Sequence, residues 1–219
     1  MAPKVKGVIF DMDGLMFDTE RIWDQFWSPC CRKMSLPDPP PEFYSNGRGL
    51  AGEHQLQYIA GYYGDKAEEL LHAVWAYCGE QIKKGVPCKP GLKELLSYLE
   101  DLGMPRIVAS SSPRTMVELN LQTTGTARYF HDIVCGNEVK LCKPAPDIFL
   151  EAARRIKVDI HDCMVLEDSH NGIRAGHASG AETVMVPDLL PVTDEMRSLY
   201  DDCCKDLFEV KAKMEQGVL

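Results

Sequence analysis

The sequence lacks any apolar run that approaches the roughly 20 residues of a membrane-spanning helix. Its first six residues also lack the long apolar segment of a secretory signal, so we expect a cytoplasmic protein without a membrane partner. Positive charge is scarce as well, because 33 acidic residues outnumber 24 Lys and Arg, for a net charge of −9. Nucleic-acid backbones bind basic surfaces, and this charge therefore argues against a nucleic-acid partner.

Pairs of cysteines in metal-binding or redox spacing are also missing. The nine cysteines form no Cys-x-x-Cys pair and no Cys/His ligand spacing. Their number is odd, and 219 residues are too many for a small scaffold held by disulfides. We therefore expect reduced thiols, as in a cytoplasmic protein. No internal repeat is present, and 45% hydrophobic residues provide for a sizeable core.

The feature that stands out is a short apolar run that ends in two carboxylates. Residues 5–10 predict a buried strand, and Asp11 and Asp13 follow it directly. Two carboxylates this close repel each other unless a cation lies between them. A hard divalent ion such as Mg²⁺ prefers oxygen ligands and would relieve that repulsion. Gly14 then allows the chain to turn sharply.

The remaining chain divides by its pattern into two parts. Residues 16–88 show helical spacing without a strong strand signal, whereas helices and strands alternate from residue 90 onward. Alternation of this kind predicts a parallel sheet with helices on both faces. We therefore predict an α/β fold: a doubly wound, Rossmann-like core of residues 1–15 and 89–219, with an α-helical cap inserted at 16–88.

Polar residues of complementary kinds follow several of the predicted strands. Ser110 ends the run 106–109, Glu167 and Asp168 end the run 163–166, and Lys143 lies in a loop before a predicted helix. In an open parallel sheet, ligands bind outside the carboxyl ends of the strands, at the switch in strand order. Each motif alone has an ordinary reading, as a solvated turn, a helix cap or a surface lysine. Their joint occurrence at one edge predicts an active site.

The residue types suit phosphoryl transfer. Asp11 is the candidate nucleophile that would form an aspartyl-phosphate, and Asp13 is the candidate acid and base for the leaving alkoxide and the attacking water. Asp168, with Glu167, would complete a Mg²⁺ site. Lys143 would neutralise charge on the phosphoryl group and keep Asp11 ionised.

Phosphate-binding groups are expected beside these carboxylates. Ser110 would donate its hydroxyl to a phosphate oxygen, and Ser111 and Gly14 would add backbone amides. In the helical insertion, the glycine-rich stretch 46–52 reads either as a plain turn or as a loop in which Arg48 offers a cation to the substrate. Trp23 reads as part of the cap core and also as a residue at the substrate mouth.

Four motifs together resemble one family: 10–14 (FDMDG), 108–112 (VASSS), 142–147 (CKPAPD) and 166–176 (LEDSHNGIRAG). The sequence resembles the haloacid dehalogenase-like hydrolase superfamily, in the subgroup similar to β-phosphoglucomutases and phosphoglycolate phosphatases. The resemblance implies Asp11 as nucleophile and Asp13 as acid and base, with the Asp13 backbone carbonyl as a further Mg²⁺ ligand.

Two departures from the mutase-like pattern favour a phosphatase. The position where that pattern has a His is Trp23 here, and the basic residue expected near Gly52 is displaced, with Arg48 the nearest cation. The expected activity is therefore Mg²⁺-dependent hydrolysis of a small phosphorylated metabolite, such as a sugar or polyol phosphate, by a monomer. A β-phosphoglucomutase-like phosphomutase and a non-catalytic metabolite-binding protein remain as alternatives.

Overall fold

A parallel sheet of six strands organises the part of the chain that the computed structural model describes, residues 4–50 and 52–219. Residues 1–3 of the predicted core and Ala51 of the predicted loop lie outside the described residues. The strand order is β3-β2-β1-β4-β5-β6, and every neighbouring pair is parallel. The strands are β1 (Gly7–Phe10), β2 (Arg106–Ser110), β3 (Ile133–Cys135), β4 (Cys163–Glu167), β5 (Glu182–Met185) and β6 (Asp202–Cys203).

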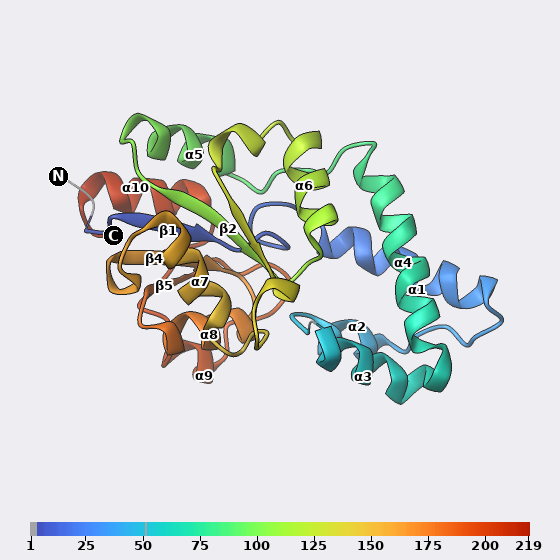
Figure 1. Ribbon diagram of the computed structural model, residues 1–219. Helices are drawn as coiled ribbons and strands as arrows, with labels where there is room; N and C mark the ends of the chain where they lie inside the picture. Colours follow the sequence, from blue (N-terminus) through green and yellow to red (C-terminus); the bar gives the residue numbers. More distant parts are fainter. Residues whose placement is uncertain (1–3, 51) are drawn as a thin grey trace.

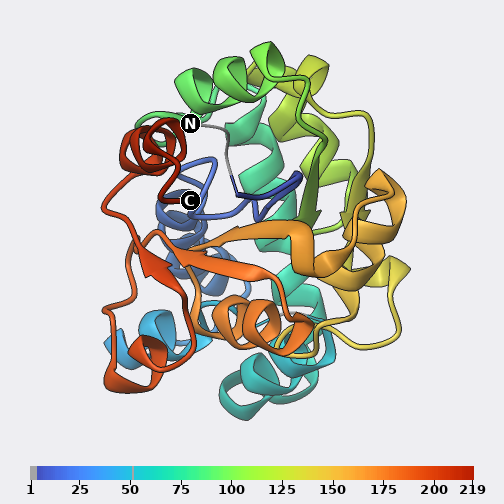
Figure 2. The same cartoon turned by 90° about the vertical axis from the view of Figure 1, so that its left-hand side faces the viewer.

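Helices cover both faces of the sheet (Figures 1 and 2). Helices α5, α6 and α10 pack on one face, and α7 and α8 pack on the other. The helices of the sheet region are α5 (Leu92–Asp101), α6 (Arg114–Thr123), α7 (Asp147–Ile156), α8 (His170–Ser179), α9 (Asp194–Arg197) and α10 (Leu207–Gln216). This architecture confirms the predicted α/β class with a doubly wound, Rossmann-like sheet.

Alternation along β1 explains why both faces need cover. Val8 and Phe10 pack into the cluster that includes α5 and α10, whereas Ile9 packs into the cluster that includes α7. Successive side chains of a strand point to opposite faces, so a strand that is apolar throughout must be buried on both sides. The continuous apolar run before Asp11 therefore specifies a central strand, as the strand order shows.

Strand β1 marks the place where the order of the strands reverses. The chain runs from β1 through β2 to β3 on one side, and β4, β5 and β6 extend the sheet on the other. Loops that leave β1 and its neighbours diverge at such a point and leave a crevice at the carboxyl edge. The topology thus puts the residues that follow β1, β2 and β4 around one crevice.

The segment between β1 and α5 is helical and lies beyond the carboxyl ends of the strands (Figure 1). It contains α1 (Glu20–Lys33), α2 (Pro41–Gly47), α3 (Gly52–Tyr63) and α4 (Ala67–Ile82), with a short 3₁₀ turn at Gly64–Lys66. Helices α1 and α4 pack against each other, as do α3 and α4. The domain boundaries at residues 15/16 and 88/89 stay a prediction.

Three local features are ones that the sequence pattern alone does not specify. Pro29 lies inside α1, which continues to Lys33 because buried residues on both sides of the proline hold the helix in place. Within the proline-rich stretch 35–42, α2 begins at Pro41, a first helical position that suits proline. The two-residue strand β6 was not expected, since it is too short to show a periodic pattern.

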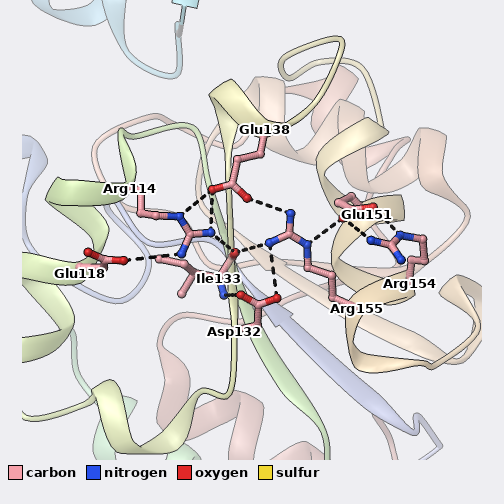
Figure 3. Close-up of polar contacts among 8 residues, drawn as sticks. All are labelled: Arg114, Glu118, Asp132, Ile133, Glu138, Glu151, Arg154 and Arg155. Carbon is pink, nitrogen blue, oxygen red and sulfur yellow. Dashed lines mark hydrogen bonds and ion pairs between the residues drawn. The ribbon is translucent and has the colours of Figure 1, made fainter.

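A network of ion pairs covers the edge strand β3 (Figure 3). The backbone carbonyl of Ile133 accepts hydrogen bonds from Arg114 at 2.9 Å and from Arg155 at 2.8 Å. Glu138 accepts from the same two arginines, each at 2.8 Å. Unpaired backbone groups on an edge strand invite pairing with other chains, so these contacts protect the edge. They also hold Glu138, which precedes the loop that carries Lys143.

The backbone N–H of Lys4 donates to the carbonyl of Leu219 at 3.4 Å, so the two ends of the described chain lie side by side (Figures 1 and 2).

Among the described residues, no helix combines the length and the apolar character that crossing a membrane requires.

Candidate active site

A buried lysine connects two of the strand ends. The Lys143 Nζ donates to Asp11 Oδ1 at 2.6 Å and to Glu167 Oε1 at 2.7 Å, and it lies 3.3 Å from the carbonyl oxygen of Ala109. The ammonium group therefore has three oxygen partners, one for each proton. All three charged side chains are buried. The structure thus places Lys143 in contact with Asp11, the residue that it was predicted to keep ionised.

Mutual pairing controls the protonation of this cluster. Burial by itself lowers the pKa of Lys143, but the Asp11 and Glu167 carboxylates outweigh it and hold that pKa above its ordinary value. Burial raises the pKa of Asp11 well above its usual range, and Lys143 opposes that rise. Lys143 thus stays charged and favours the ionised form of Asp11, the form that a nucleophile needs.

Asp168 completes a group of three buried carboxylates. Oxygens of Asp11, Glu167 and Asp168 lie within 4.8 Å of one another. The Asp168 Oδ1 is buried without a hydrogen-bond partner among the described residues. Burial, followed by repulsion from Glu167 and Asp11, raises the pKa of Asp168 well above its ordinary value. An unpartnered oxygen among crowded carboxylates suits a hard divalent cation, and these residues therefore fit Mg²⁺.

Gly14 is required where the chain passes this cluster. Its φ of +82° lies in the left-handed region, and a Cβ there would lie 2.3 Å from Asp168 Oδ2. Both the backbone conformation and the close approach exclude a side chain. Glycine at this position thus lets the loop after β1 approach the loop after β4.

Asp13 is held by three hydroxyl groups. Its Oδ1 accepts from Thr19 at 2.7 Å, and its Oδ2 accepts from Ser112 at 2.7 Å and from Ser110 at 3.3 Å. Ser110 is fully buried, and its hydroxyl also accepts from the backbone N–H of Ser112 at 3.0 Å. Ser110 therefore lies beside Asp13 and does not border the cavity described next, whereas Ser111 and Ser112 do.

A cavity of about 400 Å³ extends from the carboxylate cluster toward the helical segment. Asp11, Asp13 and Lys143 border it on the side of the sheet, and Trp23 and Arg48 border it on the side of the helices. The structure therefore brings three of the predicted catalytic residues and both predicted cap residues to one space, whereas Ser110 and Gly14 do not border it.

Arg48 was considered as a cation for the substrate, but in the structure its charge is paired with carboxylates of α1. Its guanidinium pairs with the Asp24 carboxylate, and its Nε lies 3.9 Å from Glu20 Oε2. Burial, followed by repulsion from Asp13 and Asp24, raises the pKa of Glu20 to about 7. Both acids border the cavity and neither was singled out in the sequence. Their positions at the start of α1, four residues apart, are the signal that places them on one helix face.

The loop after β5 contributes a further residue that the sequence did not reveal. Asp188 Oδ1 accepts from Lys89 at 2.7 Å and from Arg21 at 3.1 Å, and its side chain is 4% exposed. Arg21 lies in the first turn of α1, and Lys89 lies between α4 and α5. Asp188 therefore ties the two connections of the helical segment to the sheet. Its neighbours Leu189 and Leu190 border the cavity.

Contacts also join the two sides of the cavity. The Asn171 side-chain amide donates to the carbonyl of Gly49 at 3.0 Å, so the start of α8 holds the loop after α2. A Cβ on Gly49 would lie 3.3 Å from that of Ser169. The helical segment thus approaches the loop that carries Asp168.

Comparison with known proteins places this geometry in a family. The chain is 35% identical over 201 residues to a protein of Drosophila melanogaster named "Probable pseudouridine-5'-phosphatase", covering 84% of this chain and 83% of the relative. It is 27% identical over 219 residues to hexitol phosphatase B of Escherichia coli K12, covering 96% of each.

A solved structure shares the fold. The crystal structure of CbbY from Rhodobacter sphaeroides in complex with phosphate superimposes with a TM-score of 0.84 at 21% identity, covering 94% of this chain and 96% of that one. The model of the haloacid dehalogenase-like hydrolase family matches residues 8–186, which include all four motifs. The chain therefore belongs to the haloacid dehalogenase-like hydrolases.

Proposed function

We propose that the chain is a Mg²⁺-dependent phosphatase that hydrolyses a small phosphorylated metabolite through a phosphoryl group carried on Asp11. The observation that carries the proposal is the Asp11 carboxylate, held by Lys143 at 2.6 Å at the border of the cavity, with Asp13 beside it. Relatives with phosphatase names support the predicted enzyme class, a phosphoric monoester hydrolase.

In the first step, an Asp11 oxygen attacks phosphorus and the bond from phosphorus to the leaving oxygen breaks. Asp13, as the carboxylic acid, gives its proton to that oxygen and releases an alcohol. In the second step, Asp13 takes a proton from a water molecule while the water oxygen attacks phosphorus. The bond between phosphorus and Asp11 breaks, phosphate leaves, and both side chains return to their starting states.

The groups around Asp11 supply positive charge and hydrogen-bond donors. The Lys143 ammonium lies beside the nucleophile and would offset charge on the phosphoryl oxygens. The backbone amide of Ser111, which borders the cavity, is a proposed phosphate ligand. The amide of Gly14 is also proposed, but it donates to the carbonyl of Phe17 at 3.0 Å and reaches a phosphate only when it leaves that carbonyl. Ser110 acts in this proposal by orienting Asp13, and its hydroxyl reaches a phosphate oxygen only when it leaves Asp13.

Mg²⁺ would be held by the side chains of Asp11 and Asp168 and by the backbone carbonyl of Asp13. Glu167 is the fourth proposed residue of the site, although both of its oxygens already accept, from Lys143 and from the backbone N–H of Ser169. When bound, the ion would neutralise negative charge that the carboxylates and the phosphoryl group bring together.

The proposed substrates are sugar phosphates, polyol phosphates and similar monoesters. Names of two relatives, probable pseudouridine-5'-phosphatase and hexitol phosphatase B, support this class. The net charge of −9 supports the proposal that no nucleic acid is bound. We further propose a monomer that acts in the cytoplasm.

The test is release of inorganic phosphate from a panel of sugar, polyol, nucleotide and organic-acid monoesters, with Mg²⁺ and after chelation by EDTA. We expect turnover of at least one ester with Mg²⁺ and its loss with EDTA, restored when Mg²⁺ is added back. Equal turnover in EDTA would contradict the metal requirement. No turnover of any ester would revive the non-catalytic alternative, and isomerisation of a hexose 1-phosphate would establish the mutase.

An Asp13→Asn variant should turn over alkyl phosphates about 10²- to 10⁴-fold more slowly, because the leaving alkoxide and the water lose their proton donor and acceptor. The loss in the first step should be smaller with p-nitrophenyl phosphate, whose leaving group needs no proton. Rapid mixing should then show a burst of nitrophenolate followed by slow phosphate release. Equal losses with both esters and no burst would contradict the role of Asp13.

A further inference from the structure

Aromatic side chains from every helix of the helical segment border the cavity. The partly exposed ones are Trp23 of α1, Tyr44 of α2, Tyr58 of α3 and Trp75 of α4. The phosphoryl group belongs at Asp11, on the opposite side of the same space. The rest of the substrate therefore lies among aromatic rings.

The polar ends of the two tyrosines already have partners within the helical segment. The Tyr44 hydroxyl shares a hydrogen bond with Ser28 at 3.3 Å, and the Tyr58 hydroxyl donates to the carbonyl of Phe43 at 3.0 Å. An open-chain polyol carries a hydroxyl on nearly every carbon, and each hydroxyl that loses water without a new partner costs binding free energy. The aromatic walls thus give no partner to most hydroxyls of a polyol, and the acids at the start of α1 can accept from only a few. The cavity therefore favours a flat group with few hydroxyls.

The positive charges at the cavity are also committed. Among the described residues that border it, Lys143 pairs with Asp11 and Glu167, and Arg48 pairs with Asp24. A second phosphate would meet the acids of α1 rather than a free cation. The substrate that fits therefore carries one phosphate and an uncharged body.

We propose that the substrate is a nucleoside 5′-monophosphate whose planar base lies against Trp23 and Trp75. The proposal rests on the proposed phosphatase function and narrows its class, because such a nucleotide is a sugar phosphate that carries a ring. Flat bases stack on aromatic side chains through their π faces. Glu20 and Asp24, beside Trp23 on α1, offer oxygens to ribose hydroxyls and to ring N–H groups.

The first experiment compares kcat/KM for uridine and adenosine 5′-monophosphates with that for a hexitol phosphate. Stacking of one base corresponds to a roughly 5- to 150-fold gain in binding, so we expect at least about a tenfold preference for one nucleotide. Higher kcat/KM for the hexitol phosphate than for both nucleotides would overturn the proposal while leaving the phosphatase function in place.

Variants then assign the preference to the rings. Trp23→Leu and Trp75→Leu keep an apolar side chain but lose the aromatic face, and each should raise KM for the preferred nucleotide by roughly 5- to 150-fold. KM for the hexitol phosphate should stay within about twofold, since a polyol does not stack. Trp23→Phe should restore most of the loss.

Tyr77→Leu is the matched control. Tyr77 lies in α4, stacks on Phe26 and does not border the cavity, so its loss should leave both KM values unchanged. Equal increases of KM for nucleotide and hexitol phosphate in Trp23→Leu and Trp75→Leu would overturn the stacking.

A binding measurement separates this proposal from the phosphatase function. In the Asp11→Asn variant, the nucleotide should quench tryptophan fluorescence, and Trp23→Leu in that background should weaken the binding about as much as it raised KM. Quenching by a nucleotide that the unsubstituted protein never hydrolyses would overturn the nucleotide as substrate, and the panel of esters would still decide the phosphatase function. Turnover of sugar phosphates without nucleotide binding would reject ring recognition alone.

Discussion

Replacement of Asp11 by Asn should abolish phosphate release, with a loss on the order of 10⁶-fold in kcat, as when a covalent nucleophile is removed. Asn keeps the size of the side chain but has no charged oxygen that attacks phosphorus. The fold should survive, because Lys143 keeps its pairing with Glu167 at 2.7 Å. The measurement is phosphate release from the best ester of the panel, alongside thermal unfolding.

Asp65→Asn is the matched control for this substitution. Asp65 is exposed on the short 3₁₀ turn between α3 and α4, away from the cavity, so its loss should change neither activity nor stability. An Asp11→Asn variant that is folded and retains a tenth or more of the activity would contradict the nucleophile. If the variant loses both its activity and its folded state, the claim that the Lys143–Glu167 ion pair keeps it folded is contradicted.

Lys143→Met should produce the second-largest effect, because it acts on both stability and turnover. The substitution leaves the buried carboxylates of Asp11 and Glu167 facing each other without a cation. Removing one partner of a buried ion pair typically costs about 3–5 kcal/mol. For a chain of this size, that cost corresponds to a fall in Tm of roughly 10 °C. Phosphate release should also fall, since the charge beside the nucleophile is lost.

Lys140→Met tests the same chemical change three residues earlier in the same loop. Lys140 is exposed, and a surface substitution of this kind usually changes stability by less than about 0.5 kcal/mol. Unfolding of the two variants and of the unsubstituted protein should be followed by calorimetry in EDTA, so that metal binding does not enter. Equal Tm values for all three proteins would contradict the structural role of Lys143.

Much of the fold could be predicted because apolar patterns in this chain are long and regular. Strand β1 is apolar on both faces, and alternating helices and strands after residue 90 leave few topologies other than a doubly wound sheet. The helical character of the insertion was also predicted from its spacing. Strand β6 and the start of α2 were not predicted, because a strand of two residues and a proline-rich stretch show little periodicity.

The core of the candidate site could be predicted for a topological reason. Asp11, Lys143 and Asp168 follow separate strands, and parallel strands bring their carboxyl ends to one edge. The prediction therefore needed only the strand ends and the chemistry of the residues, and the family match confirms the resemblance on which their roles were based. The roles themselves stay proposals.

The helical side of the cavity was less predictable. Pairing of Arg48 with Asp24 depends on how α1 packs against the end of α2. The periodicity of a sequence predicts single helices but not the distance between two of them. Asp188 gives a similar case, because its partners Arg21 and Lys89 are more than 60 residues apart and join it only in the folded chain. Ser112 is one of three consecutive serines. The sequence does not indicate which of them would donate to Asp13.

The central claim is that the phosphoryl group passes through Asp11. The most direct measurement is rapid acid quenching of the Asp13→Asn variant during turnover of p-nitrophenyl phosphate, followed by peptide mass spectrometry. We predict a phosphorylated peptide in which Asp11 carries the phosphoryl group, and its absence from the double variant with Asp11→Asn. Turnover with the phosphoryl group on another residue, or with no phosphorylated peptide at any quench time, would contradict the account.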